Sequence, residues 1–178
     1  PPRHMRRAPR QMIGYLGEAR SVRYIRRMER IRTDILVAGG GVAGLTATAA
    51  FASAGFDTLC VDPVPPVTEA AADGSDLRST AFLMPSVRLL ESSGLWEGLT
   101  GHAAPLRIMR IVDSGGEAAE IRETADFVAE DLNEEVFGYN LPNWLLRREM
   151  TARLEDMPHA RLVTGTGVAH ITPRSSGA

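Results

Sequence analysis

The sequence predicts an α/β fold organised around a parallel βαβ unit, and three features support this prediction. An apolar run with β character at residues 35–38 ends abruptly in a Gly-rich turn at 39–44. An Ala-rich segment with helical character follows at 42–54. A second apolar run at 58–61 ends on Asp62. Strand, glycine turn, helix, strand and acid in this order are typical of a dinucleotide-binding fold.

The residues of the Gly-rich turn each have a physical role in such a fold. Gly39 permits the tight turn out of the first strand, and Gly41 lets the backbone approach a pyrophosphate. Gly44 lets the helix pack closely against the strand. Val42 and Ala43 begin the helix, where free N–H groups and the helix dipole favour phosphate. The structural alternative is a Gly-rich turn that binds nothing.

Asp62 lies roughly 20 residues beyond the glycines, where a carboxylate can accept hydrogen bonds from a ribose. Because strand, turn, helix and acid are all in register, the element predicts binding of the adenosine diphosphate half of a dinucleotide. These residues alone do not distinguish FAD from NAD.

Composition limits the classes of protein to which the chain can belong. Its 178 residues suit one domain, or one domain and part of another. A hydrophobic content of 44% and a charged content of 24% are ordinary for a soluble globular protein, and no apolar run has the length of a membrane-spanning helix. The single cysteine, Cys60, is expected to be a buried side chain rather than a nucleophile. The four histidines show no ligand-like spacing, so we expect no metal site.

The N-terminal residues carry most of the positive charge. Residues 1–32 contain ten arginines and two acids (+8), and the rest contains ten arginines and twenty acids (−10), which together give the net charge of −2. We interpret residues 1–30 as a basic leader that is disordered or not native, with Met28 as a normal beginning. The alternatives are an organelle transit peptide and an arm for nucleic acid or anionic lipid.

After the second strand, the sequence predicts loops and a helix. Residues 63–66 are rich in proline and end the strand, and residues 68–76 form a small, polar surface loop. Pro85 fits the first turn of a helix that ends at Gly94, followed by a short apolar turn at 95–99. The apolar residues of this helix are Val87, Leu89 and Leu90.

The pattern changes to an antiparallel one beyond Pro105. Residues 106–112 are predicted to form a strand, 113–116 a turn and 117–121 a return strand. Residues 123–135 are acidic and are interpreted as a loop. A hairpin inserted at this place predicts a second, mostly antiparallel layer.

The last part of the chain returns to the βαβ pattern. Asn143 is predicted to N-cap a helix that ends before Pro158, with strands following at 160–164 and 167–172. Apolar residues of this helix are Leu145, Leu146, Met150 and Leu154. Only about three parallel strands can be counted, whereas doubly wound sheets have about five, so we expect a truncated fold.

Several motifs then occur in a fixed order. They are Gly39-x-Gly41-x-x-Gly44, Asp62, Asp76-Leu77-Arg78-Ser79-Thr80-Ala81, the spaced residues Ser86, Leu90, Gly94 and Trp96, and the run Tyr139–Arg148. Over roughly residues 30–172 this succession resembles the N-terminal part of the class A flavoprotein monooxygenases. It is most similar to the ubiquinone-biosynthesis hydroxylases of the UbiH/UbiF group.

The resemblance implies a Rossmann-like FAD-binding domain of the GR2 βαβ type, with the start of an inserted antiparallel substrate layer. After the leader, residues 31–104 would form the FAD-binding βαβ region and 105–140 part of the substrate-domain sheet. Residues 141–178 would return to the FAD-binding domain and leave it incomplete. The Asp-Gly and Gly-Asp motifs of the family would lie beyond residue 178.

The resemblance also assigns roles to residues. The glycine turn would hold the FAD pyrophosphate and Asp62 the adenosine ribose. Arg78 matches a family arginine near the flavin, where its planar fork suits a phosphate or flavin oxygen, and Arg147 matches a cofactor contact. The alternative for both arginines is an ordinary surface or salt-bridging role. No side chain is assigned as catalytic, because the flavin supplies the chemistry.

The function implied is hydroxylation of a small aromatic substrate, a polyprenyl phenol, with FAD as cofactor and NAD(P)H and O2 as co-substrates. We expect a cytoplasmic protein with no nucleic-acid partner, and peripheral contact with the inner membrane because the substrate is lipophilic. This part alone is expected to be inactive. Two alternatives remain open: a truncated, non-catalytic fragment and an NAD-dependent Rossmann oxidoreductase.

Overall fold

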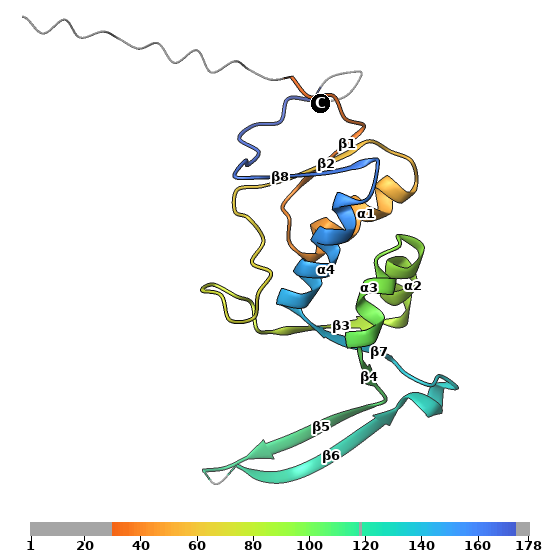
Figure 1. Ribbon diagram of the computed structural model, residues 1–178. Helices are drawn as coiled ribbons and strands as arrows, with labels where there is room; N and C mark the ends of the chain where they lie inside the picture. The colour runs from red at the N-terminus through yellow and green to blue at the C-terminus, as the bar shows by residue number, and fades with distance from the viewer. Residues whose placement is uncertain (1–29, 118, 174–178) are drawn as a thin grey trace, which may run out of the picture. The chain divides into compact units, whose positions relative to one another are not determined.

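The computed structural model describes residues 30–117 and 119–173, and the description below concerns residues 32–173 (Figure 1). The predicted leader therefore lies outside the described residues except at its last position, Arg30. The strands are β1 Ile35–Ala38, β2 Thr58–Asp62, β3 Ser79–Leu83, β4 Ala104–Leu106, β5 Ile108–Gly115, β6 Glu120–Val128, β7 Gly138–Pro142 and β8 Ala160–Thr164. The helices are α1 Val42–Ser53, α2 Met84–Ser92, α3 Trp96–Leu99 and α4 Asn143–Glu155, with short 3₁₀ turns at Thr100–His102 and Ala129–Leu132.

A parallel sheet in the order β1-β2-β8 forms the base of the βαβ unit, as predicted. Its strands are in register, with Val37 opposite Cys60 and Cys60 opposite Leu162. α1 and α4 contact each other, and each also contacts the sheet (Figure 1). Cys60 is buried, as expected. The carboxyl ends of β1 and β2 therefore meet at one edge of the sheet, beside the start of α1.

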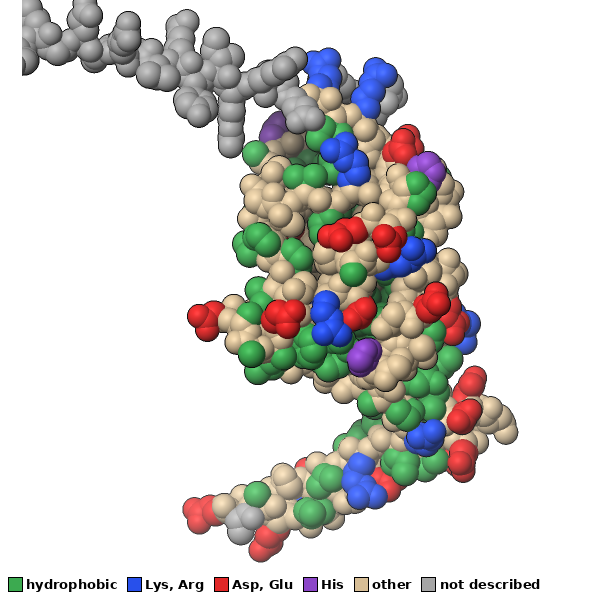
Figure 2. Space-filling model, in the orientation of Figure 1, with side chains coloured by type: hydrophobic (Ala, Val, Ile, Leu, Met, Phe, Trp, Pro, Cys, Tyr) green, Lys and Arg blue, Asp and Glu red, His purple; other side chains and the backbone are tan. Residues whose placement is uncertain are grey.

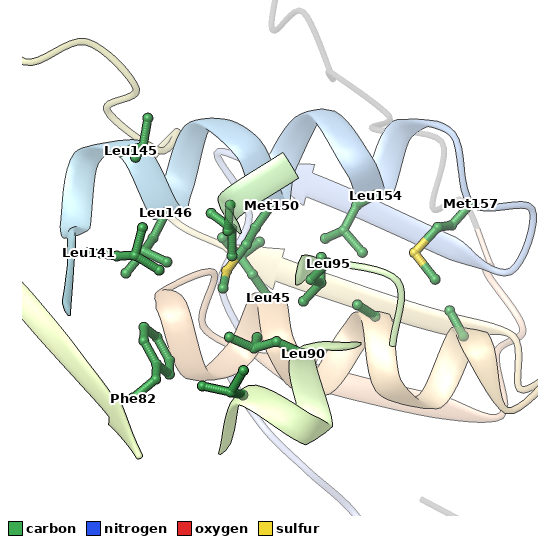
Figure 3. Close-up of a cluster of buried hydrophobic side chains, with 14 residues drawn as sticks. Leu45, Phe82, Leu90, Leu95, Leu141, Leu145, Leu146, Met150, Leu154 and Met157 are labelled. Carbon is green, nitrogen blue, oxygen red and sulfur yellow. The ribbon is translucent and has the colours of Figure 1, made fainter. Parts of the chain in front are cut away.

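The hydrophobic core lies between the four helices and extends to β3 and β7 (Figure 3). α4 contributes to this core the four apolar residues named in the sequence analysis, and α2 contributes Val87 and Leu90. Leu89, the third apolar residue of that helix, is 46% exposed and lies outside the core. Leu45 of α1 is fully buried against these helices. Because the core joins both ends of α4 to neighbouring elements, it fixes that helix beside the edge of the parallel sheet.

A second sheet, which the sequence did not predict in full, is antiparallel with the order β3-β7-β4. β3 and β7 are short, and the residues that pair between them lie about 60 positions apart in the chain, as Phe82 opposite Tyr139 illustrates. No local pattern reveals such a pairing. Gly138 allows the close approach of these strands, because a Cβ there would overlap the carbonyl oxygen of Phe82.

The strand predicted at 106–112 is divided between two sheets. β4 pairs with β7, whereas β5 pairs with β6. The division falls at Arg107: the carbonyl of Leu106 accepts from the N–H of Phe137, and the carbonyl of Arg107 accepts from the N–H of Ala129. Because the apolar pattern continues across this change of partner, the sequence shows one strand where the structure has two.

The hairpin β5–β6 is longer than predicted. Its second strand continues to Val128, so the loop predicted at 123–135 was wrong in its first half. Acidic residues are accommodated because both faces of the hairpin are exposed, and Asp126 pairs with Arg110 across the strands at 2.7 Å. Figure 2 shows hydrophobic and charged side chains together on this hairpin. Its exposed apolar residues are Ile108, Met109, Ile111, Val112, Ile121 and Phe127.

Two further predictions for the end of the chain were wrong. The strand predicted at 167–172 is irregular, because none of the described strands pairs with it. Asn143 is the first residue of α4 and not its N-cap, which is Pro142. Within the part of the chain that the structure describes, none of the helices has the length and apolar character needed to cross a bilayer.

Candidate functional site

The turn between β1 and α1 has the geometry predicted for its first and last glycines. Gly39 adopts a positive φ of 108°, a conformation that favours glycine, and its N–H donates to the carbonyl of Val61 at 2.8 Å. A Cβ at Gly44 would overlap the carbonyl oxygen of Gly39. Gly44 therefore permits the contact between the first turn of α1 and the end of β1.

The start of α1 is open. Its N-cap is Gly41, which has an extended backbone, and the described residues provide no side-chain cap and no acidic residue in the first turn. A Cβ built at Gly41 would meet no described atom within 4 Å. The N–H groups of Val42 and Ala43 belong to the first turn, which has no intrahelical acceptors. This arrangement can receive an anion.

Asp62 lies directly beside this turn. One of its oxygens, Oδ2, accepts from the N–H of Gly40 at 2.6 Å, and Oδ1 accepts from the N–H of Val64 at 2.8 Å. Because a carboxylate has about four acceptor positions, two remain for a ligand such as a ribose diol. The role of Gly40 was missed by the sequence analysis. The signal was the run of three consecutive glycines, of which Gly40 is the middle one, since a Cβ at Gly40 would lie 3.2 Å from Cβ of Asp62.

The electrostatics of Asp62 follow from these contacts. The hydrogen bonds from Gly40 and then from Val64 lower the pKa of Asp62 below its ordinary value. Burial opposes this shift with a smaller effect, and the positive charge of Arg147 adds the smallest lowering effect. Arg147 lies on α4, and its Nε is buried with no hydrogen-bond partner among the described residues. A buried guanidinium N–H without a partner is rare in proteins, which is consistent with a binding role for Arg147.

The lowered pKa of Asp62 gives a testable pH dependence. Its contribution to stability is present above the unfolded-state pKa, near 3.8, and is lost as pH falls through the lower folded-state pKa. Asp62→Asn is expected to lower the free energy of unfolding at pH 7 by about 1 kcal/mol, since two charge-assisted bonds weaken at a partly exposed site. Urea unfolding at several pH values measures this difference, which should shrink below about pH 4. A constant difference from pH 7 to pH 3 would contradict the assignment.

Arg78 occupies a different environment from Arg147. Its side chain is 84% exposed, and Nε and Nη2 donate to the two oxygens of Asp76 at 2.8 and 2.9 Å. Asp76 also accepts from Nδ2 of Asn143 at 2.9 Å, and its pKa is lowered strongly, first by Arg78 and then by Asn143. The sequence analysis missed the contribution of Asp76 and Asn143, although both lie within the motifs that it singled out.

The structure thus arranges the predicted residues in two groups. The glycine turn, the start of α1 and Asp62 are neighbours at the edge of the parallel sheet, and the charge of Arg147 acts on Asp62 without an ion pair between them. Arg78 belongs to a second group with Asp76 and Asn143, in the loop before β3 and at the start of α4. α4 connects the groups because Asn143 and Arg147 are one helical turn apart and lie on the same face.

Comparison with known proteins identifies relatives. The chain is 33% identical over 130 residues to the ubiquinone hydroxylase UbiL of Rhodospirillum rubrum, covering 73% of the chain and 29% of that protein. It is 28% identical over 139 residues to the 3-demethoxyubiquinol 3-hydroxylase of Escherichia coli, covering 77% of the chain and 34% of that protein. The chain therefore spans about a third of the length of these curated relatives.

Solved structures share its fold. The p-nitrophenol 4-monooxygenase PnpA from Pseudomonas putida matches with a TM-score of 0.62 at 18% identity, covering 83% of this chain and 35% of that one. The flavin-dependent monooxygenase PieE, solved with FAD and substrate, matches with a TM-score of 0.57 at 20% identity, covering 78% and 24%. A family model described as FAD binding domain matches residues 32–173. The chain belongs to this family of FAD-dependent monooxygenases.

Proposed function

We propose that this chain holds the adenosine diphosphate part of FAD in an aromatic hydroxylase of ubiquinone biosynthesis. The observation that carries the proposal is the open start of α1 beside Asp62, whose carboxylate is fixed by two backbone N–H groups and keeps acceptor positions for a ribose. The names of the two relatives support a ubiquinone precursor as the substrate class.

Each residue of the site would have a separate binding task. The backbone at Gly39, Gly41 and Gly44 and the first N–H groups of α1 would bind the pyrophosphate. Asp62 would accept from the ribose hydroxyls. Arg147, with its unpaired Nε, would add positive charge to the site and donate to the cofactor. Arg78 would direct its exposed guanidinium toward a phosphate or flavin oxygen.

When bound, FAD would supply the redox chemistry, with NAD(P)H as reductant and O2 as the source of the hydroxyl oxygen. The residues of this chain would bind and orient the cofactor, and none of them is assigned as a proton donor or acceptor in the reaction. The chain spans about a third of the length of its curated relatives. We therefore also propose, for the whole hydroxylase, that it acts on the aromatic substrate, uses both co-substrates and contacts the membrane peripherally.

The alternatives predict different ligands. An NAD-dependent oxidoreductase could use the same glycine turn and Asp62, but the family match and the FAD complex of PieE favour FAD. A non-catalytic fragment would bind FAD weakly or not at all. Binding of the cofactor therefore separates the proposal from both alternatives more directly than activity does.

The test is titration of the purified chain with FAD, followed by flavin fluorescence and by the flavin absorbance that remains after gel filtration. Arg147→Ala is expected to weaken FAD binding by about 10-fold, because a hydrogen bond from a charged group is lost. Arg148→Ala is the matched control, since Arg148 pairs with Glu149 and stacks over Trp144 instead. Retention of NAD but not FAD by the chain, or equal losses in both variants, would contradict the proposal.

A further inference from the structure

The loop before β3 holds Arg78 at three points. The backbone N–H of Arg78 donates to Oδ1 of Asp76 at 3.2 Å, and the backbone carbonyl of Arg78 accepts from the N–H of Asn143 at 2.8 Å. Its guanidinium donates to both oxygens of Asp76. An exposed arginine normally samples many rotamers, and a bidentate carboxylate contact restricts it to a few.

Asp76 is itself fixed, unlike most carboxylates in surface ion pairs. Its side chain is only 13% exposed, and Asn143 donates to it at 2.9 Å. Its backbone carbonyl accepts from the N–H of Trp144 at 3.2 Å, in the first turn of α4. Asn143 is held in turn by the hydroxyl of Thr80, which donates to Oδ1 of Asn143 at 2.6 Å. The carboxylate therefore has the fixed position that a side chain needs in order to orient another.

The geometry leaves part of the guanidinium of Arg78 accessible. Both bonds to Asp76 use its Nε–Nη2 edge, while the side chain as a whole is 84% exposed. The opposite edge, with Nη1, is free to meet a ligand on the solvent side. A guanidinium presented in this way keeps its charge and two or more donors available, and it loses less entropy on binding because its rotamer is already restricted.

We propose that Asp76 is a positioning residue that, together with Asn143, presents the guanidinium of Arg78 to the bound dinucleotide. This inference rests on the proposed function, because it takes FAD as the ligand of Arg78. It adds that α4 organises both arginines of the site: Arg147 belongs to the helix, and Arg78 is attached to its first residue through Asp76.

The test is a double-mutant cycle on FAD affinity with Asp76→Asn, Arg78→Ala and the double variant. Each single change is expected to weaken binding by about 10-fold, which corresponds to one charge-assisted contact. The double variant should match Arg78→Ala and not the roughly 100-fold loss of two independent effects. Asp73→Asn, an exposed acid in the same loop, is the matched control and should bind FAD like the unchanged chain.

A second measurement is independent of the cofactor. In the ligand-free chain, the Nε–H of Arg78 should exchange slowly with solvent in NMR spectra, and this protection should be lost in Asp76→Asn while the core amides remain protected. If Asp76 had only a structural role, Asp76→Asn would instead change the hydrogen exchange of the backbone amides of β3 and α4.

The outcomes are distinguishable. Additive losses in the cycle, or unchanged exchange at Arg78 in Asp76→Asn, would overturn the positioning role and leave the proposed function intact. Tighter FAD binding by Asp76→Asn would also overturn it, because Asp76 would then compete with the cofactor for Arg78. Failure of the unchanged chain to bind FAD would overturn the proposed function and this inference together.

Discussion

Gly44→Ala is expected to lower the free energy of unfolding by about 2 kcal/mol or more and to abolish FAD binding. Alanine is favoured over glycine inside a helix by up to about 1 kcal/mol, which would stabilise α1. The added Cβ, however, would overlap the carbonyl oxygen of Gly39, and overpacking typically costs about 1–3 kcal/mol or more. The cost should lie at or above the top of that range here because the obstacle is backbone, which has no alternative rotamer. The clash therefore outweighs the gain in helix propensity.

Urea unfolding, followed by the fluorescence of Trp96 and Trp144, measures this loss. Gly98→Ala in α3 is the control, since its Cβ would meet only the side chain of Glu149, at 3.4 Å from the carboxylate end and at 3.8 Å from Cβ. That flexible end can move, so the control should keep its stability. If Gly44→Ala were as stable as the unchanged chain, the close contact between the turn and α1 would be wrong.

The sequence predicted the βαβ unit well because its signals are local. The glycine turn, the helix and the acid at the end of the second strand all lie within 30 residues, and each has a steric or electrostatic reason to be there. The helix from Asn143 was predicted for the same reason, since its apolar residues recur with helical spacing. Its first residue was misassigned because Pro142, which ends β7, occupies the N-cap position.

The antiparallel part was predicted poorly because its causes are not local. β3 and β7 are defined by pairing across about 60 residues, and the change of partner at Arg107 interrupts a continuous apolar run. Acidic residues in β6 suggested a loop, although a strand exposed on both faces tolerates them. At the site, Gly40 and Asp76 were missed for a related reason. Their importance depends on which side chain faces them, Asp62 in one case and Arg78 in the other.

Gly41→Ala should separate cofactor binding from folding. The backbone of Gly41, with φ −72° and ψ 177°, is accessible to any residue, and its added Cβ would meet no atom of the described chain within 4 Å. Alanine is a poorer N-cap than glycine but reduces the entropy of the unfolded chain, so the free energy of unfolding should change by less than about 1 kcal/mol.

FAD affinity should nevertheless fall by about 100-fold in Gly41→Ala. The methyl group would occupy the space in which a pyrophosphate approaches the first turn of α1, and loss of two charge-assisted hydrogen bonds at about 1.5 kcal/mol each gives this factor. Fluorescence titration with FAD measures the effect, and Gly101→Ala, another glycine whose Cβ would be free of described neighbours, is the control. Unchanged affinity would mean that the pyrophosphate does not lie against Gly41. A parallel loss of stability would mean that the methyl group acts on the fold, so the two measurements together locate the phosphate or exclude it from this turn.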